Sequence, residues 1–292
     1  MPMDFEYYRP STIDEALQLK GRFGAQAIFM AGGTDAMVSL NKERKCSFEH
    51  LISLKGIAGL NYIKEEKDNL HIGATATHSE IAKSVLIESK YAILKDAVSQ
   101  VGSAQIRNVG TIGGNVCSSL PSADSSSPLL TMGAKVKIAS AARGEQIQDL
   151  ADFFTGAGKN ILREDELLVE FIIPAAEPNS AGGYYKIGRR KAVEIALLAA
   201  SVYLKLDKDK KTCSDARIAL GTAAPIPLRI KAAVTELTGR PVTEETLAKA
   251  GLAAVKEASP RTSFRSDADY RKAVIPVAVK RAGLLALERA LA

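Results

Sequence analysis

Apolar and polar residues alternate over short distances in the first third of the chain, and the pattern predicts strands separated by helices. Thr12 and Glu15 have the spacing of a capping box, which predicts a helix over residues 14–20. Residues 27–30 (AIFM) form an apolar run that predicts a buried strand, and this strand ends at Gly32-Gly33. Further strands are predicted over residues 51–52, 60–63 and 70–74.

The middle of the chain changes from helical periodicity to a long run of small residues. Thr77 and Glu80 form a second capping-box pair before a helix over 79–86, and the apolar spacing predicts another helix over 93–101. Residues 102–121 are rich in Gly, Asn, Ser and Thr, which is typical of a functional loop inside a globular domain. We therefore expect this stretch to carry chemistry.

Strand patterns dominate from about residue 129 to residue 221, and helical patterns follow them. Alternation over 129–138 and the apolar run 166–173, closed by Pro174, predict strands. Residues 177–183 (EPNSAGG) are the best linker candidate. After the linker we expect strands over 184–187, 196–206 and 216–221, helices over 228–237 and 244–257, and a long helix ending near Ala292 that Pro276 kinks or starts. Strands followed by helices indicate an α+β domain.

The composition is that of an ordinary globular protein of about two domains. Of the 292 residues, 46% are hydrophobic and 25% are charged, and the formal net charge is +6. The basic residues are scattered and no RNA-binding aromatic signature accompanies them, so the charge favours an anionic ligand or acidic partner over nucleic acid. No run approaches the ~18 apolar residues of a membrane span, and the N-terminus lacks a signal-peptide core, so we expect a cytoplasmic protein.

The cysteines and histidines limit what this chain can bind by itself. Cys46, Cys117 and Cys213 lie far apart and are odd in number, which argues against a disulfide framework and fits a reducing compartment. An iron–sulfur cluster normally takes four protein ligands, mostly thiolates, so the chain cannot build one alone. The three histidines lack the spacing of a zinc site. We therefore expect no metal ligands in this chain.

Two pairs of adjacent glycines are the strongest candidates for chemistry. One pair lies in residues 31–35 (AGGTD), directly after a predicted strand, and the other in residues 111–115 (TIGGN). Paired glycines let main-chain N–H groups approach a phosphate, and two such loops could hold a pyrophosphate from both sides. A Gly-Gly pair is more often only a tight turn, and neither stretch has the Rossmann or P-loop spacing. The residues alone thus predict two candidate anion-binding loops, without a nucleophile–base arrangement.

A set of stretches, in order along the chain, carries a resemblance to a known family. They are MAGGTD (30–35), HIGATATH (71–78), QIRNVGTIGGN (105–115), PSAD (121–124), ELLVEFIIP (166–174), YYKIGRR around Lys186, and GTAAPIPLR (221–229). Together they resemble the FAD-binding (medium) subunit of the molybdenum hydroxylases, the xanthine dehydrogenase and carbon monoxide dehydrogenase family. The resemblance covers nearly the whole chain and implies an oxidoreductase flavoprotein subunit.

The resemblance implies an α+β fold with a bipartite FAD-binding domain of the vanillyl-alcohol-oxidase-like (PCMH) type over 1–176, in subdomains of about 1–55 and 56–176. A smaller α/β C-terminal domain, a three-stranded sheet with helices, would occupy 177–292. FAD would bind non-covalently. Molybdopterin and [2Fe–2S] clusters would lie only on a large and a small partner subunit, in a dimer of heterotrimers. No catalytic side chain is expected, because the flavin carries the redox chemistry.

The resemblance also assigns residues to the cofactor. Those expected to hold its pyrophosphate and ribityl chain are Met30, Ala31, Gly32, Gly33, Thr34, Asp35, Thr111, Ile112, Gly113, Gly114 and Asn115. Asp124 would hydrogen-bond the cofactor, and Val101 and Leu168 would pack near the rings. Lys186 would lie near the flavin, where a cation suits the negative charge of the reduced form. The ordinary alternatives are core positions for Val101 and Leu168, a turn residue at Asp124 and a surface lysine at Lys186.

The chain departs from the family at Val109, where many relatives have Arg, and it lacks the cluster-binding insertion of some relatives. Residues 189–194, near the reactive face of the flavin in relatives, are variable, so the acceptor (NAD, quinone, ferredoxin or oxygen) stays open. The leading hypothesis is relay of electrons from partner [2Fe–2S] clusters through FAD to that acceptor. The alternatives are a free-standing flavin-dependent reductase or oxidase, which co-purification would separate, and a non-catalytic FAD-binding assembly protein.

Overall fold

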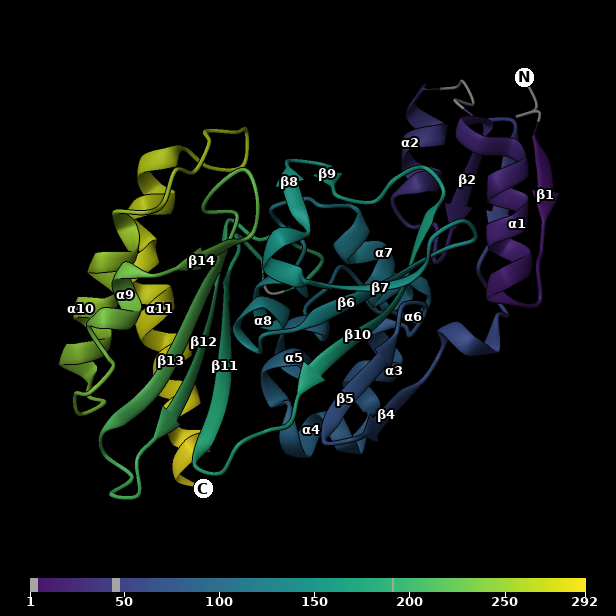
Figure 1. Cartoon of the computed structure of the whole chain (residues 1–292). Helices are drawn as coiled ribbons and strands as arrows, with labels where there is room; N and C mark the ends of the chain where they lie inside the picture. The colour runs from purple at the N-terminus through teal and green to yellow at the C-terminus, as the bar shows by residue number, and fades with distance from the viewer. Residues whose placement is uncertain (1–4, 44–47, 191) are drawn as a thin grey trace.

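The structure is a computed structural model that describes residues 5–43, 48–190 and 192–292 (Figure 1). Three larger sheets follow one another along the chain, from the purple N-terminal part on the right of Figure 1 to the green C-terminal part on the left. A small hairpin of β8 (Phe154–Gly156) and β9 (Lys159–Asn160) forms a further sheet. Cys46 lies outside the described residues.

The first sheet is small and parallel. Its strands, in spatial order, are β1 (Glu6–Tyr8), β3 (His50–Ser53) and β2 (Ala27–Met30). Helix α1 (Ile13–Phe23) begins at Thr12 as predicted, because the Thr12 hydroxyl accepts a hydrogen bond from the N–H of Glu15 (3.1 Å). Helix α2 (Ala36–Glu43) starts soon after β2. Only the short segment 31–35 therefore separates this strand from this helix.

The second sheet is antiparallel and lies at the centre of the molecule (Figure 1). Its strands, in spatial order, are β4 (Ile63–Glu66), β5 (Asn69–Gly73), β10 (Glu166–Pro174), β6 (Lys135–Ser140) and β7 (Gly144–Asp149). The apolar run that predicts β10 is confirmed, since residues 167–171 are all buried. Glu170 is the buried charged residue of this run. Its carboxylate accepts a hydrogen bond from Tyr62 (2.6 Å) and pairs with Lys137 (2.7 Å), which offsets the cost of burial.

Short helices connect β5 to β6. They are α3 (His78–Lys83), α4 (Val85–Lys90), α5 (Ala92–Val98), α6 (Ala104–Val109), α7 (Ile112–Cys117) and α8 (Ser126–Thr131). The prediction of a loop over 102–121 is wrong, because α6 and α7 occupy much of it. Ser103 and Thr111 start these helices by accepting a main-chain N–H with their hydroxyl groups. The strand predicted over 129–138 starts later, at Lys135, because α8 extends to residue 131.

The third sheet is antiparallel and has four strands. In spatial order they are β11 (Ser180–Ile187), β12 (Leu198–Leu206), β13 (Cys213–Gly221) and β14 (Leu228–Ile230). The prediction of three strands, with a helix over 228–237, is therefore wrong. Residues 228–230 pair with β13, and only α9 (Ala232–Thr235) of the predicted helix is α-helical. Apolar residues two positions apart in so short a segment fit a strand as well as a helix.

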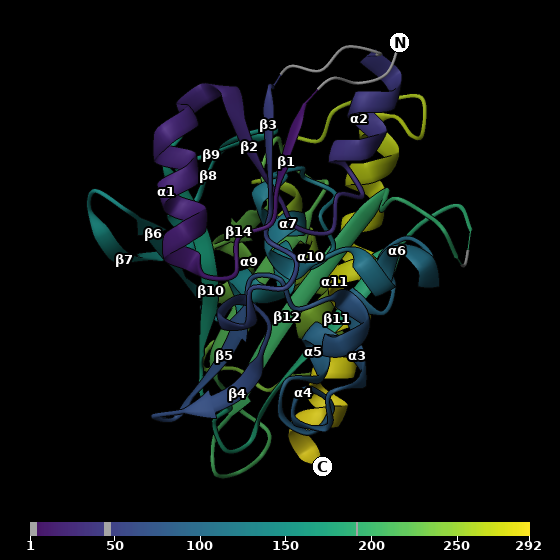
Figure 2. The same ribbon diagram turned by 90° about the vertical axis from the view of Figure 1, so that its right-hand side faces the viewer.

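The third sheet lies between helices on both faces (Figures 1 and 2). Helices α10 (Glu244–Val255) and α11 (Ala268–Leu291) cover one face, and α5 and α8 contact the other. Pro276 lies inside α11 rather than at its start. Tyr184 and Ala199 of this sheet share a core cluster with Leu94 and Phe171, so the sheet is joined to the central part of the chain by apolar packing. Among the described residues, no helix combines the length and the apolar character needed to cross a membrane.

Candidate functional site

The first glycine segment joins the end of β2 to the start of α2. Gly33 has a φ of 72°, in the left-handed region that favours glycine, so a side chain here would strain the turn. The main-chain N–H groups of residues 32–35 donate no hydrogen bond to any other described residue. Successive free N–H groups in such a turn form a concave array of donors that suits an anion. The segment is therefore able to receive negatively charged oxygen atoms.

The second glycine segment differs from the predicted loop. It forms the first turn of α7, with Thr111 as the N-cap. The N–H groups of Gly113 and Gly114 donate to the Ala74 carbonyl (2.9 Å) and to the Thr111 hydroxyl (3.1 Å), and the N–H groups on either side also donate to main-chain oxygens. The prediction that main-chain N–H groups of both glycine pairs face a ligand is therefore wrong for the second pair.

The second glycine pair instead allows close packing, and its neighbours supply side-chain donors. A Cβ atom on Gly113 would lie 2.5 Å from the carbonyl oxygen of Ala74, which is too close for any other residue. The Oδ1 atom of Asn115 accepts a hydrogen bond from the Ser125 hydroxyl (2.6 Å), which leaves the Asn115 NH₂ group as an uncommitted donor. The Thr111 hydroxyl accepts one hydrogen bond and keeps its own hydrogen to donate.

The structure brings the two segments together around one cavity of about 370 Å³. A Cβ atom on Gly32 would overlap the carbonyl oxygen of Val109, so the first segment touches the chain just before the second. The sequence-predicted site residues that line this cavity are Met30, Ala31, Gly32, Gly33, Thr34, Asp35, Val101, Thr111, Gly114 and Asn115. A ligand in the cavity would therefore meet the free N–H groups of one segment and the side-chain donors of the other.

A second cavity of about 510 Å³ adjoins the first and shares Ala31, Gly32 and Thr111 with it. Lys55 and Asn108 are among the residues of its other walls. Two cavities that share the residues around Gly32 suit an elongated ligand with two bulky ends and an anionic middle. FAD has this form, and the main-chain N–H groups of residues 32–35, which donate to no other described residue, fit its pyrophosphate.

Asp124 and Lys186, far apart in sequence, form a buried ion pair. The Asp124 carboxylate accepts hydrogen bonds from Lys186 Nζ (2.7 Å) and from the Tyr184 hydroxyl (2.7 Å). Burial raises the pKa of Asp124, while the Lys186 charge and these two hydrogen bonds oppose that rise. Lys186 Nζ also donates to the carbonyl of Gln100 (3.0 Å), next to Val101 in the cavity wall. The pair thus lies behind that wall, with Lys186 bound rather than free on the surface.

Five of the sequence-predicted site residues do not line either cavity, namely the ion pair Asp124 and Lys186 and the three residues Ile112, Gly113 and Leu168. Leu168 lies in β10 with 2% of its surface exposed, and Ile112 and Gly113 are buried residues of the first turn of α7. Leu168 belongs to the same core cluster as Ile112. The contact of Leu168 with the flavin rings stays a prediction.

His78 is a cavity residue that sequence reasoning misses. It lines the 370 Å³ cavity, is 1% exposed, and its Nδ1 atom has no hydrogen-bond partner in the described part of the chain. Burial and, to a smaller extent, the charge of Arg107 lower its pKa to about 4. A single histidine after a helix N-cap gives no sequence signal for such a position, because a core histidine has the same pattern.

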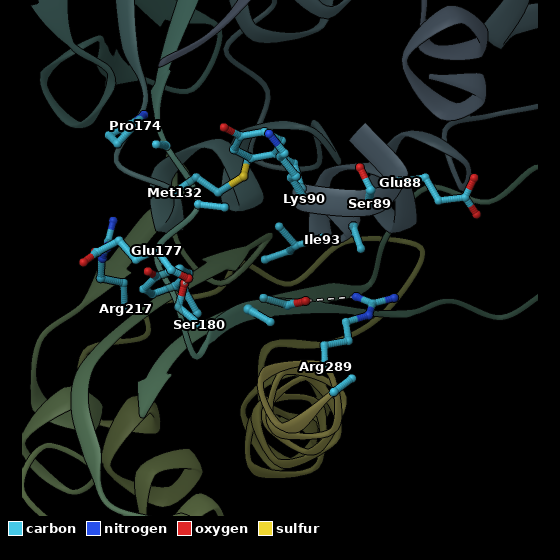
Figure 3. A pocket seen from close by; sticks show the side chains of 18 residues that line it. Glu88, Ser89, Lys90, Ile93, Met132, Pro174, Glu177, Ser180, Arg217 and Arg289 are labelled. Atoms are coloured by element: carbon cyan, nitrogen blue, oxygen red, sulfur yellow. Dashed lines mark hydrogen bonds and ion pairs between the residues drawn. The ribbon is translucent and has the colours of Figure 1, made fainter. Parts of the chain in front are cut away.

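A further cavity of about 330 Å³ lies away from the glycine segments (Figure 3). Figure 3 shows Arg289 of α11 at its edge, donating a hydrogen bond to the carbonyl of Gly182 (2.9 Å). Arg289 is also paired with Asp96 (2.6 Å), and no sequence-predicted site residue lines this cavity.

Over the described ranges, no group of three His, Cys, Asp or Glu side chains is arranged to hold a metal ion.

Family models match almost the full length of the chain. Residues 3–176 match the model of the FAD binding domain in molybdopterin dehydrogenase. Residues 183–286 match the model of the CO dehydrogenase flavoprotein C-terminal domain. The first match contains the first and second sheets, and the second match contains most of the third sheet with α9 and α10.

Individual relatives extend over the same length. The chain is 37% identical over 248 residues to the nicotinate dehydrogenase FAD-subunit of Eubacterium barkeri. This alignment covers 84% of this chain and 83% of that protein. It is 31% identical over 283 residues to the carbon monoxide dehydrogenase medium chain of Hydrogenophaga pseudoflava, in an alignment that covers 97% of this chain and 96% of that protein. A solved carbon monoxide dehydrogenase chain from Hydrogenophaga pseudoflava superposes with a TM-score of 0.92, at 31% identity and 99% coverage of both chains.

Proposed function

This chain belongs to the family of FAD-binding subunits of molybdenum hydroxylase-type dehydrogenases, and on that premise we propose that it relays electrons from [2Fe–2S] clusters of a partner subunit through FAD to a final acceptor. FAD, when bound, supplies the redox chemistry, and the chain supplies binding, orientation and electrostatics. The observation that carries the proposal is the 370 Å³ cavity that residues of both glycine segments line.

The residues around this cavity have separate roles in the proposed site. The N–H groups of residues 32–35, which donate to no other described residue, hold phosphate oxygens without covalent attachment, and Thr111 and Asn115 add a hydroxyl and an amide donor. Val101 packs against the bound cofactor. Lys186 lies near the bound flavin, and its ion pair with Asp124 (2.7 Å) and its hydrogen bond to the Gln100 carbonyl (3.0 Å) fix it next to the wall at Val101.

The proposed partners are a large molybdopterin subunit and a small [2Fe–2S] subunit, assembled in the cytoplasm as a dimer of heterotrimers. The names of two relatives, which are medium chains of carbon monoxide dehydrogenases, support the part of this proposal that places the chain in a complex with larger and smaller subunits. Within the chain we propose an FAD-binding domain over 1–176, in subdomains of about 1–55 and 56–176, followed by a C-terminal domain over 177–292. The three larger sheets fall within these three ranges.

The cofactor part of the proposal is tested by replacing Gly33 with valine. The φ of 72° at Gly33 is unfavourable for a β-branched residue, so Gly33→Val distorts the array of free N–H groups. We expect the purified variant to lose bound flavin, with an affinity for added FAD at least ~10-fold weaker, as loss of one or two hydrogen bonds to a charged group predicts. Flavin absorbance and fluorescence titration measure both.

The matched control is Gly21→Ala in helix α1, where an added Cβ atom meets nothing within 4 Å. This variant should bind FAD like the unmodified chain. Equal flavin content in Gly33→Val would mean that the first segment is only a turn. An unmodified chain that neither contains flavin nor takes up added FAD would contradict the proposed function itself.

The relay part of the proposal is tested with partners. Co-expression with a large molybdopterin subunit and a small [2Fe–2S] subunit should yield one complex, in which substrate reduces the FAD of this chain. A chain that purifies alone and oxidises a soluble substrate by itself would instead favour the free-standing flavoenzyme.

A further inference from the structure

His78 lies where helix α3 meets the first glycine segment. Its main-chain N–H donates to the carbonyl of Gly110 (3.0 Å), which fixes the start of α3 against the chain before α7. A Cβ atom built on Gly110 would lie 3.4 Å from Cδ2 of His78 and 3.7 Å from the hydroxyl oxygen of Thr34. The Cδ2 edge of the imidazole therefore faces the same point as the Thr34 side chain, at the wall of the 370 Å³ cavity.

The two ring nitrogens of His78 are in different environments. Nδ1 is fully enclosed and has no hydrogen-bond partner among the described residues. Nε2, which is bonded to Cδ2, also makes no hydrogen bond to a described residue, but it is not among the fully enclosed atoms. A neutral imidazole carries one N–H, and an unpaired buried N–H is costly. The hydrogen is therefore expected on Nε2, at the edge that faces the cavity.

Nε2 is the ring atom that a ligand in the cavity can reach, and it makes no hydrogen bond to a described residue, so such a ligand can supply its partner. We propose that His78 is a further cofactor-binding residue, whose Nε2–H donates a hydrogen bond to an oxygen atom of the bound dinucleotide beside Thr34. The proposal rests on the proposed function, because the dinucleotide is FAD. Phosphate oxygens and ribityl hydroxyls share the required chemistry, since both accept a hydrogen bond.

The charges around the ring agree with a neutral donor. The charge of Arg107 in α6 also lowers the pKa of His78, and the Arg107 guanidinium donates to the carbonyl of Val101 (2.9 Å). Glu80, on the same helix as His78, is committed to the Thr77 hydroxyl (2.8 Å) and to Asn61 (3.2 Å). No described carboxylate pairs with the imidazole, so the bound ligand is the group available to accept its hydrogen.

The test compares His78→Gln, His78→Asn and His78→Phe in the full-length chain, with FAD affinity measured by quenching of flavin fluorescence. The amide nitrogen of glutamine can take the place of Nε2, whereas that of asparagine replaces Nδ1. We expect His78→Gln to bind FAD within ~3-fold of the unmodified chain. His78→Asn and His78→Phe should bind about ten- to a hundredfold more weakly, as loss of one hydrogen bond to the ligand predicts.

Controls separate this inference from folding and from the proposed function. His50→Asn replaces a histidine of β3 that lines neither of the two cavities, and it should keep the original affinity. Thermal unfolding without FAD checks that the variants fold. If the unmodified chain binds FAD and His78→Asn and His78→Phe bind it equally well, His78 is not a cofactor-binding residue. The same conclusion follows if His78→Gln is as weak as His78→Phe. Absence of FAD binding in the unmodified chain would contradict the proposed function instead.

Discussion

The buried residue His78 should make the free energy of unfolding of the FAD-free chain measurably dependent on pH under acidic conditions. Its pKa is lowered from the ordinary 6.5 to about 4, mainly by burial. The unfolded chain therefore binds a proton at a higher pH than the folded chain does. The stability linked to this histidine is fully present above pH 6.5, and it is lost as the pH falls from there toward 4.

The corresponding prediction concerns the difference between the unmodified chain and His78→Gln, whose side chain does not titrate. Between pH 7 and pH 4.5, the unmodified chain should lose roughly 2 kcal/mol more of its free energy of unfolding than the variant does. Denaturant unfolding without FAD at several pH values measures this. Parallel pH profiles of the two proteins would show that the imidazole does not stay neutral in the folded state.

At the next scale, the elements most readily predicted from sequence are those with local signals. The hydroxyl caps at Thr12 and Thr77 identify the starts of α1 and α3, and the long apolar run identifies β10. Helices α6 and α7 are missed because glycines and polar residues weaken the helical pattern, while tertiary hydrogen bonds hold the turns. Strand β14 is missed because only its pairing with β13 distinguishes it from a helix.

The candidate site follows the same division between local and non-local signals. Paired glycines identify both segments, and the cavity lining agrees with most of the expected residues. The state of their N–H groups is not readable from sequence, because the partner of Gly113 is the distant carbonyl of Ala74. The Asp124–Lys186 contact is equally non-local, since it depends on β11 packing near α8. What the sequence lacks here is the identity of hydrogen-bond partners.

Close packing of α11 on β11 gives a prediction at the scale of elements. A Cβ atom on Gly183 of β11 would overlap the main-chain carbonyl of Ala282 in α11, and neither backbone can move alone. We expect Gly183→Ala to lower the free energy of unfolding by about 1–3 kcal/mol, as overpacking of a core does. Thermal unfolding should show a lower Tm, by about 2–4 °C per kcal/mol for a protein of this size class.

Gly156→Ala in β8 is the matched strand control for Gly183→Ala. An added Cβ atom there meets only the Lys159 side chain, at 3.8 Å, which is ordinary contact. Gly156→Ala should change the free energy of unfolding by no more than about 0.5 kcal/mol, as most surface substitutions do. Equal stability of the two variants would contradict the rigid contact between α11 and β11.

At the scale of the whole molecule, the central and C-terminal parts are joined by apolar packing and by polar contacts. The core cluster that contains Phe171 of the central sheet also contains Tyr184 of the third sheet. Arg289, near the end of α11, pairs with Asp96 of α5 through two hydrogen bonds (2.6 and 3.0 Å). The Asp124–Lys186 pair adds a second link, beside the cofactor cavity.

These links predict that the chain unfolds as one unit, although proteins with several domains often unfold in steps. Calorimetry of the chain without FAD should give one transition, with calorimetric and van't Hoff enthalpies that agree. Adding FAD at about 100 times its dissociation constant should stabilise the whole transition by roughly 2.7 kcal/mol, because the ligand binds only the folded state. Lys186→Met removes the ion pair with Asp124, and it should lower the temperature of the single unfolding transition without splitting it into two. Two separate transitions, of which FAD shifts only one, would show that residues 177–292 fold independently of the cofactor site.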